Sequence, residues 1–274
     1  MTTPNALTAA IRAGIAQLRK ISVDPTPQQL AEDAQDALDC IEVVMSAIAE
    51  ITTPAMSERM FLGLQLLRAS CDYARALAFL FANNPVDLAG AALVLHRAQI
   101  ESFLRAVFFS QLATEDELTD FFDNDQGPRH RTDRGKWVKI SVPALAVEVQ
   151  EQLACTEKAE PGTGNLGRMV ANAWDPLCGM VHGGRAVHEL YVDGQRQIGC
   201  SVPAPVQYQV TVNAVAIVNF CLAAACTISG WGGQQENSAL DAPLRRFHLF
   251  VEQHNARLRS VGLHDMQRHI DGDQ

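Results

Sequence analysis

Hydrophobic residues along much of the chain recur at intervals of three and four positions, which is the spacing of one face of an α-helix. Residues 27–51 show this pattern clearly, with apolar residues at Leu30, Ala34, Leu38, Ile41, Val44, Met45 and Ile48. The residues at the start agree, because Thr26 is a typical helix cap, Pro27 suits the first helical position, and Gln29 can complete a capping box. We therefore predict a helix over this range.

Similar start and stop signals occur along the rest of the chain. Thr114 and Glu117 can form a second capping box, and Gly183-Gly184 is a natural helix stop. The predicted helices cover about 55–82, 85–113, 114–123, 143–154, 166–182, 205–230 and 241–261. Because the connections between the first long helices are short, these helices are expected to pack antiparallel.

Two segments depart from the helical pattern. Residues 124–141 are predicted to be an irregular loop region, since Gly127-Pro128 breaks the chain and the charges change sign there. Residues 187–202 alternate weakly in polarity, so a small hairpin and an extended loop both fit. We predict an all-α protein, a single helical bundle of about seven to nine helices over residues 1–262, with a flexible C-terminal tail at 263–274.

The composition indicates a folded chain in a reducing compartment. With 274 residues, 47% of them hydrophobic, the chain has ample material for a core. Its seven cysteines form no CxxC pair and lie mostly in apolar stretches, which is typical of buried thiols. The first 20 residues show the spacing of a short amphipathic helix and lack the continuous apolar run of a secretory signal. The predicted location is cytoplasmic.

One segment, residues 210–231, is about long enough to cross a bilayer. Asn213 and Asn219 lie within it and many of its apolar residues are alanines, which favours a buried core helix. The formal net charge of -9 opposes binding to DNA or to anionic membranes over most of the surface. We expect no membrane and no DNA partner.

The most informative polar residues lie on the helix predicted at 85–113. Arg97 and Glu101 project from its apolar face at a spacing that lets them pair, and Arg105 can share the same carboxylate. Ionic groups inside a bundle are costly unless they are paired, so their presence points to a site. The alternative is a structural pin that fixes the register of the helices.

His182 is the second candidate. Pro176 interrupts the helical pattern before it, so Asp175 either caps a new helix or marks a kink. In the last helical turn His182 meets the negative end of the helix dipole, and the glycines after it leave room for a ligand. This position suits an acid–base group and equally a histidine that caps its own helix. Trp174 and Arg185 flank it and are candidate ligand-binding residues.

A family resemblance accompanies these residues. Its features are a long helix with three charged residues, a histidine–glycine turn and a later apolar helix: Arg97, Glu101, Arg105, His182-Gly183-Gly184 and the segment after Ile198-Gly199 and Pro203. Together they resemble uncharacterised bacterial helical families grouped with HEPN-like and abortive-infection proteins, over about residues 55–230. The resemblance implies a helical bundle, often dimeric, and RNA cleavage by an Arg and a His a few residues apart on one helix. This sequence departs from that pattern. The arginines nearest His182 are Arg168, fourteen residues before it, and Arg185, three residues after it and beyond the predicted helix stop at Gly183-Gly184.

Metal and nucleic-acid motifs are weak. The eight histidines are scattered without an HExxH motif or a Cys/His pair at ligand spacing, so no metal and no cofactor is predicted. The basic run from Arg129 to Lys139 includes Trp137 and has the composition of an RNA contact. Six acids at 115–125 favour the alternative of a self-neutralising surface loop.

Three functional hypotheses follow. In the first, the protein is a self-associating binding or regulatory module whose internal polar residues fix the structure or hold a small anionic ligand. The second is a divergent HEPN-like ribonuclease, or a toxin or phage-defence component, which binds RNA. The third is a membrane-attached protein that uses residues 210–231. The candidate catalytic residues are His182, Arg97 and Glu101, and the candidate ligand-binding residues are Arg105, Arg185 and Trp174.

Overall fold

The structure is a computed structural model, and it describes residues 25–51, 56–132, 134–157, 166–183, 185–191, 199–200, 202–230 and 234–260. The described chain is almost entirely helical and contains one small two-stranded sheet. The predicted all-α class is therefore confirmed. The amphipathic helix predicted near the N-terminus and the tail predicted at 263–274 lie outside the described residues.

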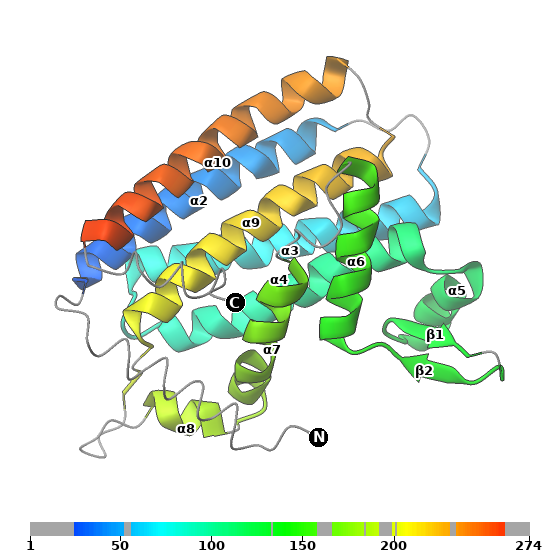
Figure 1. Cartoon of the computed structure of the whole chain (residues 1–274), viewed down its shortest axis with the longest axis horizontal. Helices are drawn as coiled ribbons and strands as arrows, with labels where there is room; N and C mark the ends of the chain where they lie inside the picture. Colours follow the sequence, from blue (N-terminus) through cyan, green and yellow to red (C-terminus); the bar gives the residue numbers. More distant parts are fainter. Residues whose placement is uncertain are drawn as a thin grey trace, which may run out of the picture.

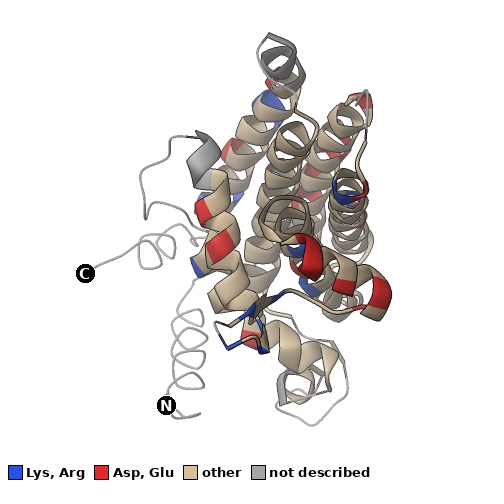
Figure 2. Ribbon diagram, turned by 90° about the vertical axis from the view of Figure 1, so that its right-hand side faces the viewer, with Lys and Arg blue, Asp and Glu red and all other residues tan. Residues whose placement is uncertain are grey.

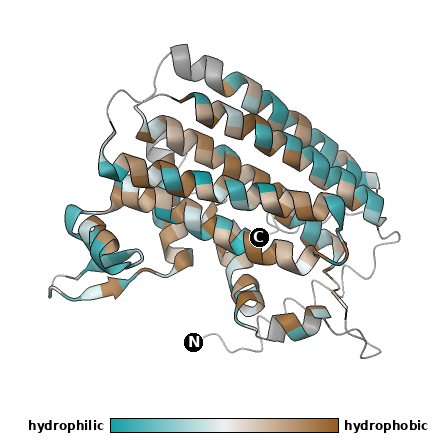
Figure 3. Cartoon of the chain, turned by 180° about the vertical axis from the view of Figure 1, so that it is seen from behind, coloured by the Kyte–Doolittle hydropathy of each residue, from teal (hydrophilic) through white to brown (hydrophobic). Residues whose placement is uncertain are grey.

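The long helices form a bundle that a smaller group of elements extends on one side (Figure 1). The bundle consists of α2 (Pro27–Glu50), α3 (Glu58–Asn83), α4 (Ala89–Val107), α9 (Ala204–Ile228) and α10 (Gln234–Ser260). In it, α2 packs against α10, α9 and α3, while α3 packs against α4. The long helices carry both hydrophilic and hydrophobic residues (Figure 3), as amphipathic helices of a bundle do.

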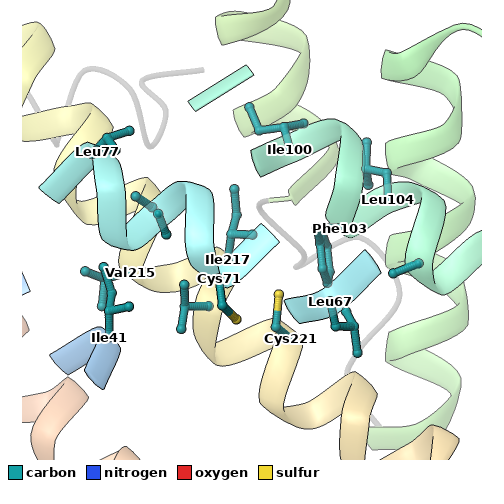
Figure 4. Packing of buried hydrophobic residues seen from close by; sticks show 14 of the residues in the cluster. Ile41, Leu67, Cys71, Leu77, Ile100, Phe103, Leu104, Val215, Ile217 and Cys221 are labelled. Atoms are coloured by element: carbon teal, nitrogen blue, oxygen red, sulfur yellow. The ribbon is translucent and has the colours of Figure 1, made fainter. Parts of the chain in front are cut away.

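The core lies where α3, α4 and α9 meet. Leu67 and Cys71 of α3, Phe103 of α4, and Ile217 and Cys221 of α9 are almost fully buried there (Figure 4). Burying a large apolar side chain stabilises the fold by about 1.5–3 kcal/mol. Burial, reinforced by the neighbouring Cys71 thiol, raises the pKa of Cys221 well above its ordinary value. These thiols are therefore part of the apolar packing, as their place in the sequence predicts.

The apolar helix α9 is long and hydrophobic enough to cross a membrane, by length and composition alone. However, 56% of its most hydrophobic window is buried inside the described structure. It contacts α2, α3, α4 and α10, which lie around it. This packing is what a core helix of a soluble protein requires, so the predicted core helix accounts for the apolar stretch.

Both predicted capping boxes are present. Thr26 Oγ1 accepts a hydrogen bond from the Gln29 N–H at 3.2 Å, and the Gln29 side chain accepts one from the Thr26 N–H at 2.8 Å. Thr114 and Glu117 make the same reciprocal pair at the start of α5 (Glu115–Asn124). Each box satisfies two backbone N–H groups that the helix itself leaves unpaired. The helix starts at these positions are thus set by local sequence.

The helix predicted at 85–113 begins later than expected. Residues 85–88 form turns, and α4 starts at Ala89. The Asn84 side chain holds this turn, because its Oδ1 accepts from the N–H of Asp87 at 2.9 Å and its Nδ2 donates to the Asp87 carboxylate. The local side-chain bonds therefore stabilise a turn where the pattern predicts a helix start.

The same helix also changes character near its end. After α4 the chain continues as a π-helix, η1 (Phe108–Leu112), in which each turn is wider than an α-helical turn. Arg59 of α3 donates to the carbonyl oxygens of Phe109 at 2.9 Å and Ala113 at 2.7 Å. These bonds satisfy carbonyl groups near the end of η1. The periodicity alone did not predict this widening.

The irregular loop predicted at 124–141 contains a short antiparallel hairpin, which corrects the prediction. Its strands are β1 (Arg129–Arg131) and β2 (Trp137–Lys139). Gly135 occupies the connection at φ +75°, a left-handed conformation that favours glycine. Because each strand has only three residues, the alternation of polarity is too short to be recognised in the sequence.

The helices α6 (Val142–Glu157) and α7 (Leu166–Val181) pack together and against α4. α7 runs without interruption through Pro176, so Asp175 does not cap a new helix there. The helix ends at the predicted stop, where Gly183 adopts φ +65°. The packed α7 therefore tolerates a proline that costs about 3 kcal/mol in an isolated helix.

Two further boundaries differ from the predictions. At the segment predicted as hairpin or loop, 187–202, the first residues belong to the short helix α8 (Arg185–Tyr191), while 192–198 lie outside the described residues. α10 begins at Gln234 instead of residue 241 and includes Pro243. In both cases weak local signals were insufficient to locate a helix start.

Candidate functional site

The packing of α4 against α7 brings Arg97 and His182 together. Arg97 Nη1 donates to His182 Nε2 at 3.3 Å, although the two residues are 85 positions apart. Two more of the predicted residues contact Arg97, because Glu101 lies one turn later on α4 and Trp174 faces it from α7. The structure thus gathers Arg97, Glu101, Trp174 and His182 into one cluster, which we call the Arg97 cluster.

Arg97 is the centre of this cluster. Its guanidinium carbon lies 5.1 Å from the centroid of the Trp174 ring, in cation–π geometry. Arg97 Nη2 lies 3.5 Å from Glu101 Oε1, which is a long ion pair. The side chains of Arg97 and Glu101 are 15% and 28% exposed. The pair therefore sits at the edge of the bundle, more accessible than the apolar face of α4 predicts.

One donor of Arg97 remains unsatisfied. Its Nε is buried and has no hydrogen-bond partner among the described residues. A buried donor without a partner costs about 1–3 kcal/mol, so such groups usually indicate a bound water, ion or ligand. Together with the long bond to Glu101, this leaves the guanidinium only loosely satisfied by the protein.

His182 is held by the end of α7. Its backbone N–H donates to the Cys178 carbonyl at 3.1 Å, and Gly183 then turns the chain away. The His182 side chain is exposed. Because arginine can only donate, His182 Nε2 acts as the acceptor in this contact.

Cys178 lies one turn before His182 and borders the cluster. Burial raises the pKa of its thiol, the charge of Arg97 opposes this, and Asp175 and Glu101 add to the rise. The thiol is therefore kept in its protonated, less nucleophilic form. This agrees with the inert thiol that its apolar neighbours predict.

Arg105 is not brought to this cluster. No ion pair joins Arg105 to Glu101 among the described residues, and Arg105 instead reaches toward Gly127, whose position lies just before the hairpin. Successive turns of α4 carry Arg105 about 12 Å along the helix from Arg97, beyond the reach of a shared contact. Arg185 begins α8, but its side chain lies outside what the structure describes.

A second charged cluster, between α2 and α10, was not predicted from the sequence. Asp33 accepts from His254 Nδ1 at 2.9 Å and from Arg257 Nη1 at 3.2 Å, and Arg257 also binds Asp36. The side chains of Asp33 and His254 are only 1% and 4% exposed. A signal was present, since Asp33 lies next to Ala34 on the apolar face of α2. We call this group the Asp33 cluster.

His96, one residue before Arg97, is buried in a separate network. Gln99 Nε2 donates to the Ala214 carbonyl at 2.9 Å, so Gln99 Oε1 is free to accept from His96 Nδ1 at 2.9 Å. His96 Nε2 is buried and has no partner among the described residues. Burial lowers the pKa of His96 to about 4, against a smaller opposing effect of Gln99. The ring is therefore neutral at physiological pH, and the Gln99 side chain that it contacts ties α4 to α9.

The chemistry available to the Arg97 cluster is hydrogen-bond donation and proton transfer. A fixed guanidinium binds anionic oxygens, and a nearby histidine can exchange a proton with a bound group. In the described part of the chain, no group of three His, Cys, Asp or Glu residues is placed to hold a metal ion. The geometry therefore favours the recognition of an anion.

Comparisons with known proteins identify a family but no close relative. Neither the curated proteins nor the solved structures include a match to this chain. A family model does match, over residues 67–247, which is more than half of the chain and includes both α4 and α7. The matched family is described as a family of unknown function, DUF6988. The matched span contains all the residues of the Arg97 cluster, and the chain belongs to the DUF6988 family.

Proposed function

We propose that this protein is a cytoplasmic binding or regulatory module that holds a small anionic ligand at the Arg97 cluster. The observation that carries the proposal is the 3.3 Å contact between Arg97 Nη1 and His182 Nε2. Two side chains that can donate hydrogen bonds meet there from different helices, and the protein leaves the guanidinium only partly satisfied. A carboxylate or phosphate group could accept from both side chains.

The two side chains offer an anion different groups. Arg97 supplies a guanidinium that is always charged and can only donate. In the free protein it donates to His182 Nε2, and an anion that binds between the two side chains replaces this contact.

Sulfate is a suitable probe, because it is a small anion whose oxygens accept hydrogen bonds from both side chains. We expect isothermal titration calorimetry to detect sulfate binding by the wild type at neutral pH. Arg97→Met and His182→Ala should abolish binding, and Glu101→Gln should tighten it by removing a competing negative charge. Arg68→Met and His248→Ala, at exposed positions on other helices, are the matched controls and should bind like the wild type.

No sulfate binding by the wild type, or binding that survives in both Arg97→Met and His182→Ala, would contradict this proposal. Loss of binding in the control variants to the same extent would assign the effect to overall charge. Circular dichroism of each variant distinguishes loss of the site from loss of the fold.

A second function, RNA cleavage, is favoured by the same contact. HEPN-like ribonucleases use an Arg and a His on one helix, whereas here Arg97 and His182 come from α4 and the end of α7. An Arg97 guanidinium at a phosphate and His182 as the acid–base group suit that reaction. Cleavage of RNA by the wild type and its loss in His182→Ala would support this toxin or phage-defence role over a purely binding role.

Self-association is the remaining part of the proposal. Phe61, Phe122 and Met56 are 53%, 51% and 47% exposed, and a groove of about 540 Å³ between α3 and α5 is lined by Phe61 and Phe122. Exposed apolar side chains grouped in this way are common at protein interfaces. Light scattering after size-exclusion chromatography should therefore report a mass above that of one chain, and Phe61→Asp should shift it toward the monomer.

A further inference from the structure

The β1–β2 hairpin concentrates positive charge on an acidic protein. Residues 129–139 contain five Lys and Arg residues, while the whole chain has a formal net charge of -9. Lys and Arg residues are coloured blue along this hairpin in Figure 2, beside the acidic α5. In Figure 1 the hairpin projects from the bundle at the end opposite α8. Its local field therefore has the opposite sign to that of the molecule as a whole.

The register of the hairpin organises these charges around an aromatic ring. Arg129 pairs with Lys139 and Arg131 pairs with Trp137, so these four side chains share one face of the two-stranded sheet. The guanidinium carbons of Arg129 and Arg131 lie 4.7 Å and 5.9 Å from the centroid of the Trp137 ring. Stacking on the indole keeps the planar guanidinium groups extended and ordered.

The hairpin is anchored from its other face. His130 Nε2 contacts Glu148 of α6 at 3.0 Å and His130 Nδ1 contacts Glu117 of α5 at 3.2 Å. Burial alone would lower the pKa of His130, but the bonds to Glu148 and Glu117 outweigh it and raise the pKa. On the basic face itself, Arg129 adds a second anchor through its ion pair with Asp120. These contacts with α5 and α6 thus hold the hairpin, and the basic face with it, in place.

The acids of α5 compensate only part of this charge. Arg129 is paired with Asp120, and Arg131 lies 3.9 Å from Asp116, at the limit of an ion pair between two well-exposed side chains. The other three cations have exposed side chains and no carboxylate within 4.0 Å among the described residues: Arg134, Lys136 and Lys139. Among the described residues, the acids of α5 therefore pair with two of the five cations.

We propose that this basic face of the hairpin binds the phosphodiester backbone of single-stranded nucleic acid. Arg131, Lys139 and the exposed cations near the turn offer several positive charges on one short hairpin, which matches a chain with one charge at every nucleotide. Arg131, which lies over the indole and is well exposed, can also donate to phosphate oxygens. The proposal rests on the hairpin alone and is independent of the Arg97 cluster.

Fluorescence anisotropy of a labelled oligouridine of about 20 nucleotides tests this inference. The triple variant Arg134→Gln/Lys136→Gln/Lys139→Gln should bind at least about ten-fold more weakly than the wild type at low salt. For this variant, the slope of log affinity against log salt concentration should be shallower by about 2, because three phosphate contacts are lost. The matched control Arg68→Gln/Arg245→Gln/Arg259→Gln removes the same net charge from exposed positions on α3 and α10, and should change affinity less than about two-fold.

The inference would be overturned if the wild type did not bind at low salt, or if the two triple variants weakened binding equally. Equally tight binding of a polyglutamate of similar length would also overturn it, and would assign the face to acidic proteins. Oligothymidine in parallel determines whether the 2′-hydroxyl contributes. His182→Ala should bind oligouridine like the wild type. Loss of sulfate binding in this variant, together with unchanged binding of oligouridine, would show that the two sites are separate.

Discussion

Two clusters in this protein each combine an arginine, a histidine and a carboxylate, but they differ in closure. In the Asp33 cluster the carboxylate is 1% exposed and accepts hydrogen bonds at 2.9 Å and 3.2 Å from His254 and Arg257. In the Arg97 cluster the carboxylate of Glu101 is 28% exposed, and the contacts around Arg97 are 3.3 Å and 3.5 Å long. The same residue types thus form one closed and one open arrangement.

The difference follows from what surrounds each carboxylate. Asp33 lies between α2 and α10 with the buried ring of Tyr208 against His254, and burial together with the charge of Asp33 raises the pKa of Tyr208 to about 12. A charge in such a place must be fully bonded by the protein, because water cannot reach it. Glu101, at the edge of the bundle, is accessible to water. In the proposed function the loosely bonded Arg97 beside it binds the anion, whereas the Asp33 cluster joins helices.

Removing the buried carboxylate should have the largest effect on stability. Asp33→Ala leaves His254 and Arg257 without their shared partner, and we expect the free energy of unfolding to fall by about 3–5 kcal/mol. Asp72→Ala on α3 is the matched control, since Asp72 pairs with Arg68 on an exposed helix face and should cost less than about 1 kcal/mol. Urea denaturation measures both. Similar losses in the two variants would show that the Asp33 cluster does not join the helices.

A fall in pH should have an intermediate effect on stability, through the protonation of His96. Its pKa is lowered from the ordinary value of 6.5 to about 4 in the folded protein, so the unfolded chain takes up a proton between these values that the folded chain does not. The resulting stability is present above about pH 6.5 and is lost as the pH falls toward 4, by up to about 3 kcal/mol.

Urea denaturation at several pH values between about 7 and 4.5 checks this, with His96→Leu as the comparison. The variant should lose stability less steeply in acid than the wild type, because it has no ring to protonate. His182→Ala, which leaves His96 in place, should keep the wild-type slope. A wild-type slope in His96→Leu would contradict the assignment.

The smallest effects on stability are expected at the open cluster. Arg97→Met loses the contact with Trp174 and a long ion pair, and should cost about 0.5–1 kcal/mol. His182→Ala removes an exposed side chain and should change stability by less than about 0.5 kcal/mol. Urea denaturation of both variants is the measurement. A loss as large as that of Asp33→Ala would identify the Arg97 cluster as the structural pin that the sequence leaves open as the alternative.

Local features of the chain were predictable from the sequence. The capping boxes at Thr26 and Thr114 and the stop at Gly183 appear where they were expected, because each depends on residues within one helical turn. The apolar periodicity likewise predicted the all-α class and the buried helix at 205–230. Short-range exceptions were missed, namely the π-helix after Val107 and the hairpin at 129–139, because tertiary contacts from Arg59, Glu117 and Glu148 help to hold them.

What the sequence by itself determined about this protein is which segments are helical and which polar residues lie on their apolar faces. Only the tertiary structure decided which of those residues meet. Arg97 and His182 are 85 positions apart, and Asp33 and His254 are 221 apart, so no local pattern could pair them. The physical reason is that helix formation depends on bonds between near neighbours, whereas the pairing of distant side chains depends on how whole helices pack.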